Sequence, residues 1–159
     1  MSTNVVTTPG DSELGAEFAF PTASTVGNIL LVEDQKLVRD VTAEVLRRAG
    51  YSVVTAATAS EAQQRFASMA GEVALVITDV FLPDGKGTGL AETFSRLSSQ
   101  LPVILTSGHP GKETEGCAGI QRAWFMAKPY SAEILLDMVQ RVLGTLNSRS
   151  LAVSASAAR

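Results

Sequence analysis

Short apolar runs rich in β-branched residues alternate along this chain with segments whose apolar residues have helical spacing. Such runs are typical of strands buried on both faces, and a helix in each connection predicts that neighbouring strands are parallel. The predicted strands span residues 29–32, 51–56, 75–79, 102–107 and 123–127. The sequence therefore predicts an α/β fold, a five-stranded parallel sheet doubly wound in (βα)5 order, with three α/β/α layers.

The first and last predicted helices have apolar faces that can be buried against this sheet. In the segment from Lys36 to Ala49, the apolar residues at helical spacing are Leu37, Val38, Val41, Val45 and Leu46. In the last helix they are Ile134, Leu135, Met138, Val142 and Leu146. Burial of each larger side chain is worth roughly 1.5–3 kcal/mol, which is enough to dock both helices.

Local signals mark where several helices begin. Thr58 and Glu61 form a capping-box pattern that opens the second helix, and Ser131 is the expected cap of the last one. From Lys112 to Ile120 the helical signal is the weakest, because two glycines interrupt it. We expect this fourth helix to be the least stable of the domain.

The composition divides the chain into one domain with two tails. Residues 1–27 are rich in Ser, Thr, Ala, Gly and Pro and are expected to form a flexible leader, although Gly15 to Pro21 alternates like a strand. Residues 28–146 hold all the predicted elements, and residues 147–159 are expected to be a disordered tail. A chain of 159 residues suits this single-domain organisation.

Charge, cysteine content and hydropathy argue against several classes of protein. A net charge of −3 and a pI near 5.1 give no electrostatic reason to expect nucleic-acid binding. The single cysteine, Cys117, excludes an internal disulfide and fits a reducing compartment. No apolar run approaches a membrane span, and the first eight residues lack a secretory signal pattern. We therefore expect a cytoplasmic protein that binds neither nucleic acid nor membrane.

Chemically active side chains lie at, or directly after, the carboxyl ends of four of the predicted strands. They are Glu33 and Asp34 after the first, Asp79 at the end of the third, Ser107 at the end of the fourth and Lys128 after the fifth. A parallel sheet brings these ends to one edge, where ligands bind in open α/β folds. Three crowded carboxylates require a cation, and oxygen ligands without His or Cys favour Mg²⁺ (or Mn²⁺).

This set of residues suits phosphoryl transfer, which depends mainly on positioning and charge neutralisation. Asp79 is the predicted nucleophile, and the metal is expected on Asp34 and Asp79, with Glu33 binding directly or through water. Lys128 is expected to neutralise a phosphoryl oxygen, and Ser107 to donate its hydroxyl to another.

Four segments carry these residues: Val32-Glu33-Asp34, Thr78-Asp79-Val80-Phe81-Leu82-Pro83, Leu105-Thr106-Ser107-Gly108 and Lys128-Pro129. Together they resemble the receiver domain of two-component response regulators, the CheY-like family, which implies a flavodoxin-like fold. The similarity covers residues 28–146, with the signature positions in order. It implies that Asp79 is phosphorylated from a phosphohistidine on a partner histidine kinase or histidine phosphotransfer protein.

The resemblance also implies roles for other residues. The backbone carbonyl of Phe81 is expected to complete the metal site, and the Lys128–Pro129 bond is expected to be cis. Ser107 and Phe125 match the hydroxyl and the aromatic that move together on phosphorylation in this family. Their movement is expected to switch the face formed by the fourth helix, fifth strand and fifth helix, where a downstream protein partner of unknown identity binds.

Two features of the site concern residues that vary within this family. Glu33 replaces the commoner first Asp, which favours a water-mediated contact with the metal. Phe81 and His109 occupy positions that tune the lifetime of the phosphoryl group, and a bulky apolar Phe81 is expected to slow hydrolysis.

Other functions are possible for such a chain. A degenerate receiver that acts only as a protein-binding module is one alternative. A haloacid-dehalogenase-like phosphatase is a weaker one, because its second Asp is replaced here by Phe81. A flavodoxin-like cofactor binder is weaker still, because Glu33 and Asp34 would repel a phosphate. No enzyme activity is expected beyond catalysis of the domain's own phosphorylation and dephosphorylation.

The wider context of the domain has two interpretations. The chain is either a stand-alone regulator, expected to be a monomer or a weak homodimer, or the receiver part of a hybrid histidine kinase. The segment from Gly15 to Pro21 faintly resembles the terminal strand of a kinase ATP-binding domain, which precedes the receiver in hybrid kinases.

Overall fold

The computed structural model of this chain describes residues 27–69, 71–109 and 120–156, with side chains as far as residue 144. Its centre is a five-stranded sheet in the order β2-β1-β3-β6-β7, with every neighbouring pair parallel. The strands are β1 (Asn28–Val32), β2 (Val53–Ala56), β3 (Val73–Asp79), β6 (Val103–Ser107) and β7 (Ala123–Ala127). The predicted α/β fold with a parallel five-stranded sheet is therefore confirmed.

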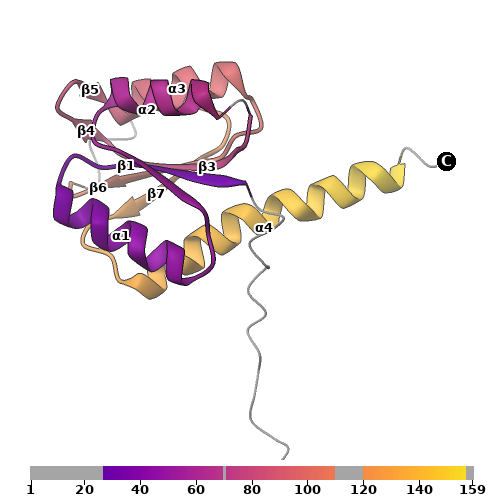
Figure 1. Cartoon of the computed structure of the whole chain (residues 1–159). Helices are drawn as coiled ribbons and strands as arrows, with labels where there is room; N and C mark the ends of the chain where they lie inside the picture. The colour runs from indigo at the N-terminus through magenta and orange to yellow at the C-terminus, as the bar shows by residue number, and fades with distance from the viewer. Residues whose placement is uncertain (1–26, 70, 110–119, 157–159) are drawn as a thin grey trace, which may run out of the picture.

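Four described helices cover the two faces of the sheet, which gives the three predicted layers. Figure 1 shows α2 and α3 on one face, with α1 and α4 on the other. The helices are α1 (Lys36–Arg48), α2 (Ala59–Ser68), α3 (Gly87–Leu97) and α4 (Ala132–Ser156). Residues 112–119 of the predicted fourth helix, Cys117 among them, lie outside the described residues, as does the segment from Gly15 to Pro21, whereas the other two elements of the predicted switch face are described as β7 (Ala123–Ala127) and α4.

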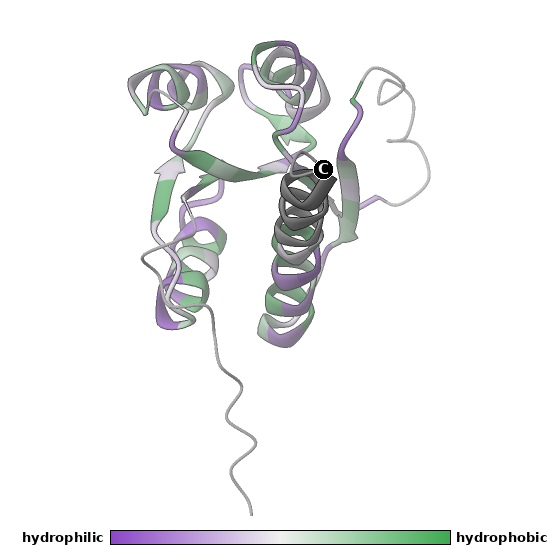
Figure 2. Cartoon of the chain, turned by 90° about the vertical axis from the view of Figure 1, so that its right-hand side faces the viewer, coloured by the Kyte–Doolittle hydropathy of each residue, from purple (hydrophilic) through white to green (hydrophobic). Residues whose placement is uncertain are grey.

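Strand alternation divides the core between these two faces. Leu30 and Val32 point to the α2–α3 side, where Phe66 stacks on Phe94 with ring centroids 4.3 Å apart. Ile29 and Leu31 point to the α1–α4 side. In Figure 2 the strands are largely green while the helices carry both colours, as expected for a sheet buried between amphipathic helices.

The predicted helix starts are present. The Thr58 hydroxyl accepts a hydrogen bond from the Glu61 amide at 3.1 Å, and the Glu61 carboxylate accepts one from the Ala57 amide at 2.8 Å. The Ser131 hydroxyl accepts a hydrogen bond from the Ile134 amide at 3.2 Å. These side chains satisfy amides that the first turn of a helix leaves without backbone partners.

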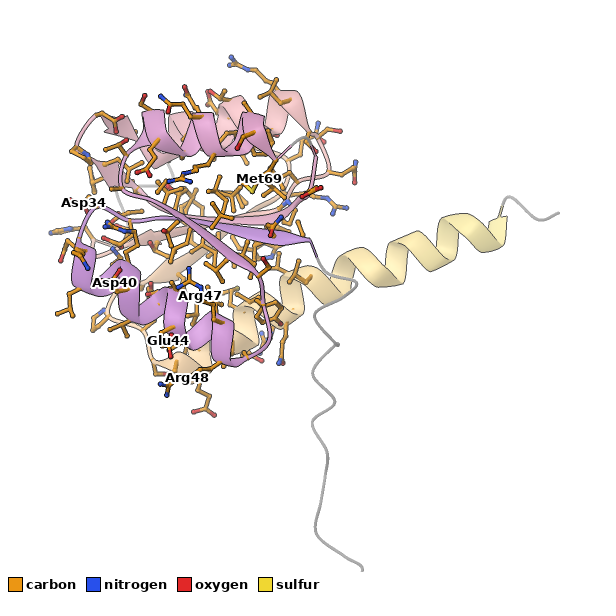
Figure 3. All side chains as sticks on the ribbon, in the orientation of Figure 1. Asp34, Asp40, Glu44, Arg47, Arg48 and Met69 are labelled. Carbon is orange, nitrogen blue, oxygen red and sulfur yellow. The ribbon has the colours of Figure 1, made fainter. Side chains whose placement is uncertain are left out.

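The apolar face predicted for the first helix is wrong in part. Leu37 and Val41 are 77% and 56% exposed, whereas the predicted Leu46 is buried, together with Thr42 and Ala43, which were not predicted. Ala43 and Leu46 both belong to the buried cluster on this face of the sheet. Figure 3 shows Asp40, Glu44 and Arg48 along α1, and all three are exposed.

The last helix also differs from expectation. Ile134, predicted to be in the core, is 53% exposed, whereas Leu135 and Val142 are buried as expected. Helix α4 continues to Ser156, past residue 147 where the tail was expected to begin, and extends away from the sheet (Figure 1). The segment after Leu146 contains no Gly or Pro to end a helix, and alanine favours its continuation.

A small hairpin follows β3 where only a loop was predicted. Strands β4 (Phe81–Leu82) and β5 (Gly85–Lys86) pair antiparallel, with Phe81 opposite Lys86 and Leu82 opposite Gly85. Among the residues that the structure describes, no helix is both long enough and apolar enough to cross a membrane.

Candidate functional site

The carboxyl edge of the sheet brings the predicted site residues together. In the parallel register, Val32 pairs with Thr78, Asp79 with Thr106, and Ser107 with Ala127. Glu33 and Asp34 directly follow β1, and Lys128 directly follows β7. Residues separated by almost one hundred positions therefore meet because their strands end at one edge.

Three carboxylates form a cluster at this edge. Oxygen atoms of Glu33, Asp34 and Asp79 lie within 4.8 Å of one another. Glu33 and Asp79 are buried, with 2% and 8% exposure, whereas Asp34 is exposed (Figure 3). A compact set of oxygen donors, open on one side, fits a hard divalent cation such as Mg²⁺ that keeps part of its water shell.

Lys128 bridges the two buried carboxylates. Its ammonium nitrogen lies 2.6 Å from Glu33 Oε2 and 2.6 Å from Asp79 Oδ2. Burial alone lowers the pKa of Lys128, but the hydrogen bonds to Asp79 and Glu33 outweigh burial and raise it above its ordinary value. Burial raises the pKa of Glu33, although the hydrogen bond from Lys128 opposes this effect.

The second oxygen of Asp79 is held by the following loop. Asp79 Oδ1 accepts a hydrogen bond from the Phe81 amide at 3.1 Å. With Lys128 on Oδ2, each oxygen of the carboxylate has a fixed partner, so the group is oriented before any ligand binds. Phe81 is two residues after Asp79, and its side chain is 56% exposed.

Gly87 lies against the backbone of Asp79. A Cβ atom on Gly87 would lie 1.9 Å from the Asp79 carbonyl oxygen and 2.9 Å from Thr78 Oγ1. Thr78 Oγ1 donates to that same carbonyl oxygen at 3.0 Å, and the Gly87 amide donates to the Val80 carbonyl at 2.8 Å. Only glycine allows this approach, a requirement that the sequence analysis missed; a glycine at the start of a helix after the site loop was its only sequence signal.

Arg39 is a second residue that the sequence analysis missed. Its guanidinium donates to the backbone carbonyls of Glu33 at 2.6 Å and Asp34 at 3.2 Å, and the Gln35 amide donates to Glu33 Oε1 at 3.1 Å. These contacts hold the turn that carries two of the three carboxylates. An arginine on the first turn after an acidic pair was the only signal in the sequence.

Ser107 ends β6, His109 follows it by two residues, and Phe125 lies within β7. Ser107 is buried, and its hydroxyl accepts a hydrogen bond from the His109 amide at 3.1 Å. Phe125 lies on the neighbouring strand β7 and is 38% exposed, so its ring is not held in the core. The Lys128–Pro129 bond is cis, as the resemblance implied.

A groove between α1 and α4 opens beside Lys128. Its volume is about 590 Å³, and it reaches Gly108 and Lys128 at the edge of the site. The apolar part of its lining includes Leu37, Val38, Val41, Pro129 and Leu135. The apolar residues of α1 that are not buried against the sheet therefore line a surface continuous with the carboxylate cluster.

Comparison with protein families gives an independent result. Residues 29–140 match the family model of the response regulator receiver domain. The chain is 32% identical to the nitrogen assimilation regulatory protein NtrX of Azorhizobium caulinodans over 125 residues, which cover 77% of this chain and 27% of that protein. It is 29% identical to the sensor kinase CckA of Brucella abortus over 116 residues, which cover 72% of this chain and 12% of that protein.

Solved structures give the same relationship. The receiver domain of the hybrid histidine kinase CckA has a TM-score of 0.63 and 33% identity, and the match covers 74% of this chain and 99% of that one. A CheY-like receiver domain protein from Methanospirillum hungatei has a TM-score of 0.69 and 28% identity, with 79% and 99% covered. This chain thus matches whole receiver domains but only a fraction of the length of NtrX and CckA.

Proposed function

The chain belongs to the response regulator receiver domain family of two-component signalling, and we propose that its Asp79 accepts a phosphoryl group from a phosphohistidine of a partner protein. We assign the domain to residues 28–146 and place it in the cytoplasm. The observation that carries the proposal is the position of the Asp79 carboxylate and the charged groups around it. It lies at the end of a central strand, within 4.8 Å of two further carboxylates and 2.6 Å from a lysine ammonium.

In the proposed reaction, an Asp79 carboxylate oxygen attacks phosphorus, the bond to the imidazole nitrogen breaks, and the imidazole leaves with that electron pair and takes up a proton. Lys128 balances the charge of one phosphoryl oxygen after releasing its bond to Asp79. The Ser107 hydroxyl donates to another phosphoryl oxygen, and Phe125 moves with it into the space that this shift creates.

A Mg²⁺ or Mn²⁺ ion held by Glu33, Asp34, Asp79 and the Phe81 carbonyl would supply the remaining charge neutralisation. The chemistry of the donor set supports this assignment, since all the proposed ligands are oxygen atoms. Glu33 is already bonded to Lys128 and to the Gln35 amide, which supports a contact with the metal through water.

The partner that delivers the phosphoryl group is proposed to be a histidine kinase or histidine phosphotransfer protein. A donor imidazole that reaches Asp79 must cover the adjoining surface, and the groove between α1 and α4 is continuous with Lys128. Leu37 is 77% exposed on this surface, which suits an apolar patch of the donor protein. The matches to the regulatory protein NtrX and to the receiver domain of the hybrid histidine kinase CckA are compatible with either setting, a stand-alone regulator or the receiver part of a hybrid kinase.

The test uses acetyl phosphate with Mg²⁺ and intact-mass spectrometry. The wild-type chain is expected to gain the mass of one phosphoryl group, lose it on treatment with hydroxylamine, and gain nothing when EDTA is present. Asp79→Asn is expected to gain nothing, because an amide cannot form the acyl phosphate. An unmodified wild-type chain at saturating Mg²⁺ would contradict the proposal and favour a degenerate receiver that only binds partners.

A further inference from the structure

We propose that Asp84 is a positioning residue that fixes the β4–β5 hairpin against helix α2 and thereby sets the affinity of the site for Mg²⁺. The inference rests on the proposed function, because it concerns the loop that supplies the Phe81 carbonyl to the metal. It goes further by assigning a role to a carboxylate outside the acidic cluster.

Asp84 lies at the turn of the hairpin and binds the start of α2 with both carboxylate oxygens. Oδ1 accepts a hydrogen bond from the Ala59 amide at 2.8 Å, and Oδ2 accepts one from the Ser60 amide at 2.9 Å. The hydrogen bonds from Ser60 and Ala59 lower the pKa of Asp84 below its ordinary value. Two consecutive amides at a helix N-terminus favour an anionic partner in this arrangement.

The hairpin has little else to hold its tip. Of residues 81–86, all of which the structure describes, only Leu82 is buried, and two residue pairs form the whole ladder. An isolated two-stranded hairpin is marginally stable in water. The carboxylate of Asp84 therefore supplies a tertiary contact at the turn of the hairpin.

The hairpin also carries the proposed metal ligand. Phe81 begins β4, and its amide donates to Asp79 Oδ1 at 3.1 Å. A shift of the hairpin tip moves the Phe81 peptide group and, through this hydrogen bond, the Asp79 carboxylate. Partners that orient metal ligands from outside commonly change metal affinity when they are removed.

The start of α2 provides a matched control. The first amides of α2 donate hydrogen bonds to two acceptor side chains. Thr58 accepts from the Glu61 amide, whereas Asp84 accepts from the amides of Ala59 and Ser60. Thr58 is the residue directly before α2 and is not part of the hairpin. Removal of either acceptor weakens the same helix end, but only removal of Asp84 releases the hairpin.

The experiment measures Mg²⁺ affinity by isothermal titration calorimetry for the wild type, Asp84→Ala, Asp84→Asn and Thr58→Ala. We expect Asp84→Ala to weaken Mg²⁺ binding by about tenfold. Asp84→Asn, which keeps one acceptor oxygen, is expected to lie between Asp84→Ala and the wild type. Thr58→Ala is expected to keep the wild-type affinity while its thermal midpoint falls.

A second measurement follows the hairpin without metal. Hydrogen exchange read by mass spectrometry on the peptide covering residues 80–87 is expected to be faster in Asp84→Ala than in Thr58→Ala. Equal Mg²⁺ affinity in Asp84→Ala and the wild type, or an equal loss in Thr58→Ala, would overturn the inference while leaving the metal site in place. A wild-type chain that binds no Mg²⁺ would overturn the metal site itself, and this inference with it.

Discussion

The site at the carboxyl edge of the sheet has a buried half and an exposed half. The two halves differ in how completely contacts within the chain fix the positions of their side chains. Glu33, Asp79 and Lys128 form the buried half, joined by two contacts of 2.6 Å. Asp34 and Phe81 form the exposed half, and Phe81 is 56% exposed. Among the described residues, no buried side-chain nitrogen or oxygen lacks a hydrogen-bond partner. The buried half is therefore organised by contacts within the chain, whereas the exposed half is the side on which the proposed metal and phosphoryl donor would bind.

The largest expected effect comes from crowding the backbone of the buried half. Gly87→Ala introduces a Cβ atom 1.9 Å from the Asp79 carbonyl oxygen, so the backbone around Asp79 must move. Overpacking of this kind costs about 1–3 kcal/mol, and we expect at least this loss in urea unfolding together with loss of phosphorylation by acetyl phosphate.

Gly89→Ala is the matched control, because a Cβ atom on Gly89 meets nothing within 4 Å. Gly89 also lies in α3, where replacing glycine by alanine is expected to stabilise the chain by about 0.5–1 kcal/mol. Equal stability of the two variants would show that the close approach at Gly87 does not constrain the site.

The next effect comes from removing the cation of the buried half. Lys128→Met leaves Glu33 and Asp79 without their counter-charge, and we expect a loss of about 2 kcal/mol at neutral pH. Guanidinium titrations measure this loss, and Lys36→Met is the control. Lys36 pairs with Asp40 on the surface of α1, so its removal is expected to change stability little.

The pH dependence of stability tests the same contact. Because the folded chain raises the pKa of Lys128 above its ordinary 10.5, this lysine stabilises the fold fully below pH 10.5 and loses that contribution as pH rises through its folded pKa. The wild type should therefore lose stability at alkaline pH more steeply than Lys128→Met. Parallel curves for the two proteins would contradict the coupling of Lys128 to Glu33 and Asp79.

A smaller effect is expected on the groove that adjoins the exposed half. Leu37→Asp places a charge on the apolar surface beside Lys128, and phosphotransfer from a phosphohistidine donor is expected to fall by about tenfold, as for an interface residue worth about 1.4 kcal/mol. Phosphorylation by acetyl phosphate is expected to stay unchanged, because a small donor does not use the groove.

The control for Leu37 is Leu97→Asp on the opposite face of the sheet. Leu97 is 69% exposed at the end of α3, so a charge there should be tolerated equally well. An equal loss of phosphotransfer in both variants would argue against a role for the groove in donor binding.

The smallest effect is expected at the mouth of the site. Phe81→Asn replaces an exposed apolar ring by an amide that can hold water near the acyl phosphate, and we expect a shorter half-life. The change is expected to be tenfold or less, which corresponds to about 1.4 kcal/mol or less of the barrier to hydrolysis. Loss of the phosphoryl mass over time measures it, and an unchanged half-life would contradict the screening role of Phe81.

Sequence patterns predicted the sheet and which residues meet at its carboxyl edge, but not the outer surfaces of the helices. The apolar runs ending in Glu33 and Asp79 indicated which strand ends carry carboxylates, because burial on both faces leaves a strong signal. The apolar spacing in α1 did not indicate that Leu37 and Val41 remain exposed. That outcome depends on which side of α1 packs against the sheet and α4, and the apolar spacing of one helix does not contain this information.

The sequence by itself determined the alternation of strands and helices along the chain, the helix caps at Thr58 and Ser131, and the identity of the residues at the carboxyl edge of the sheet. These features depend on local periodicity and on the rule that parallel strands share one edge. Only the tertiary structure decided that Lys128 bridges Glu33 and Asp79, that Gly87 has no room for a side chain, and that Asp84 binds the start of α2. Each of these contacts joins separate elements of the fold, so its geometry exists only once the sheet and helices have packed.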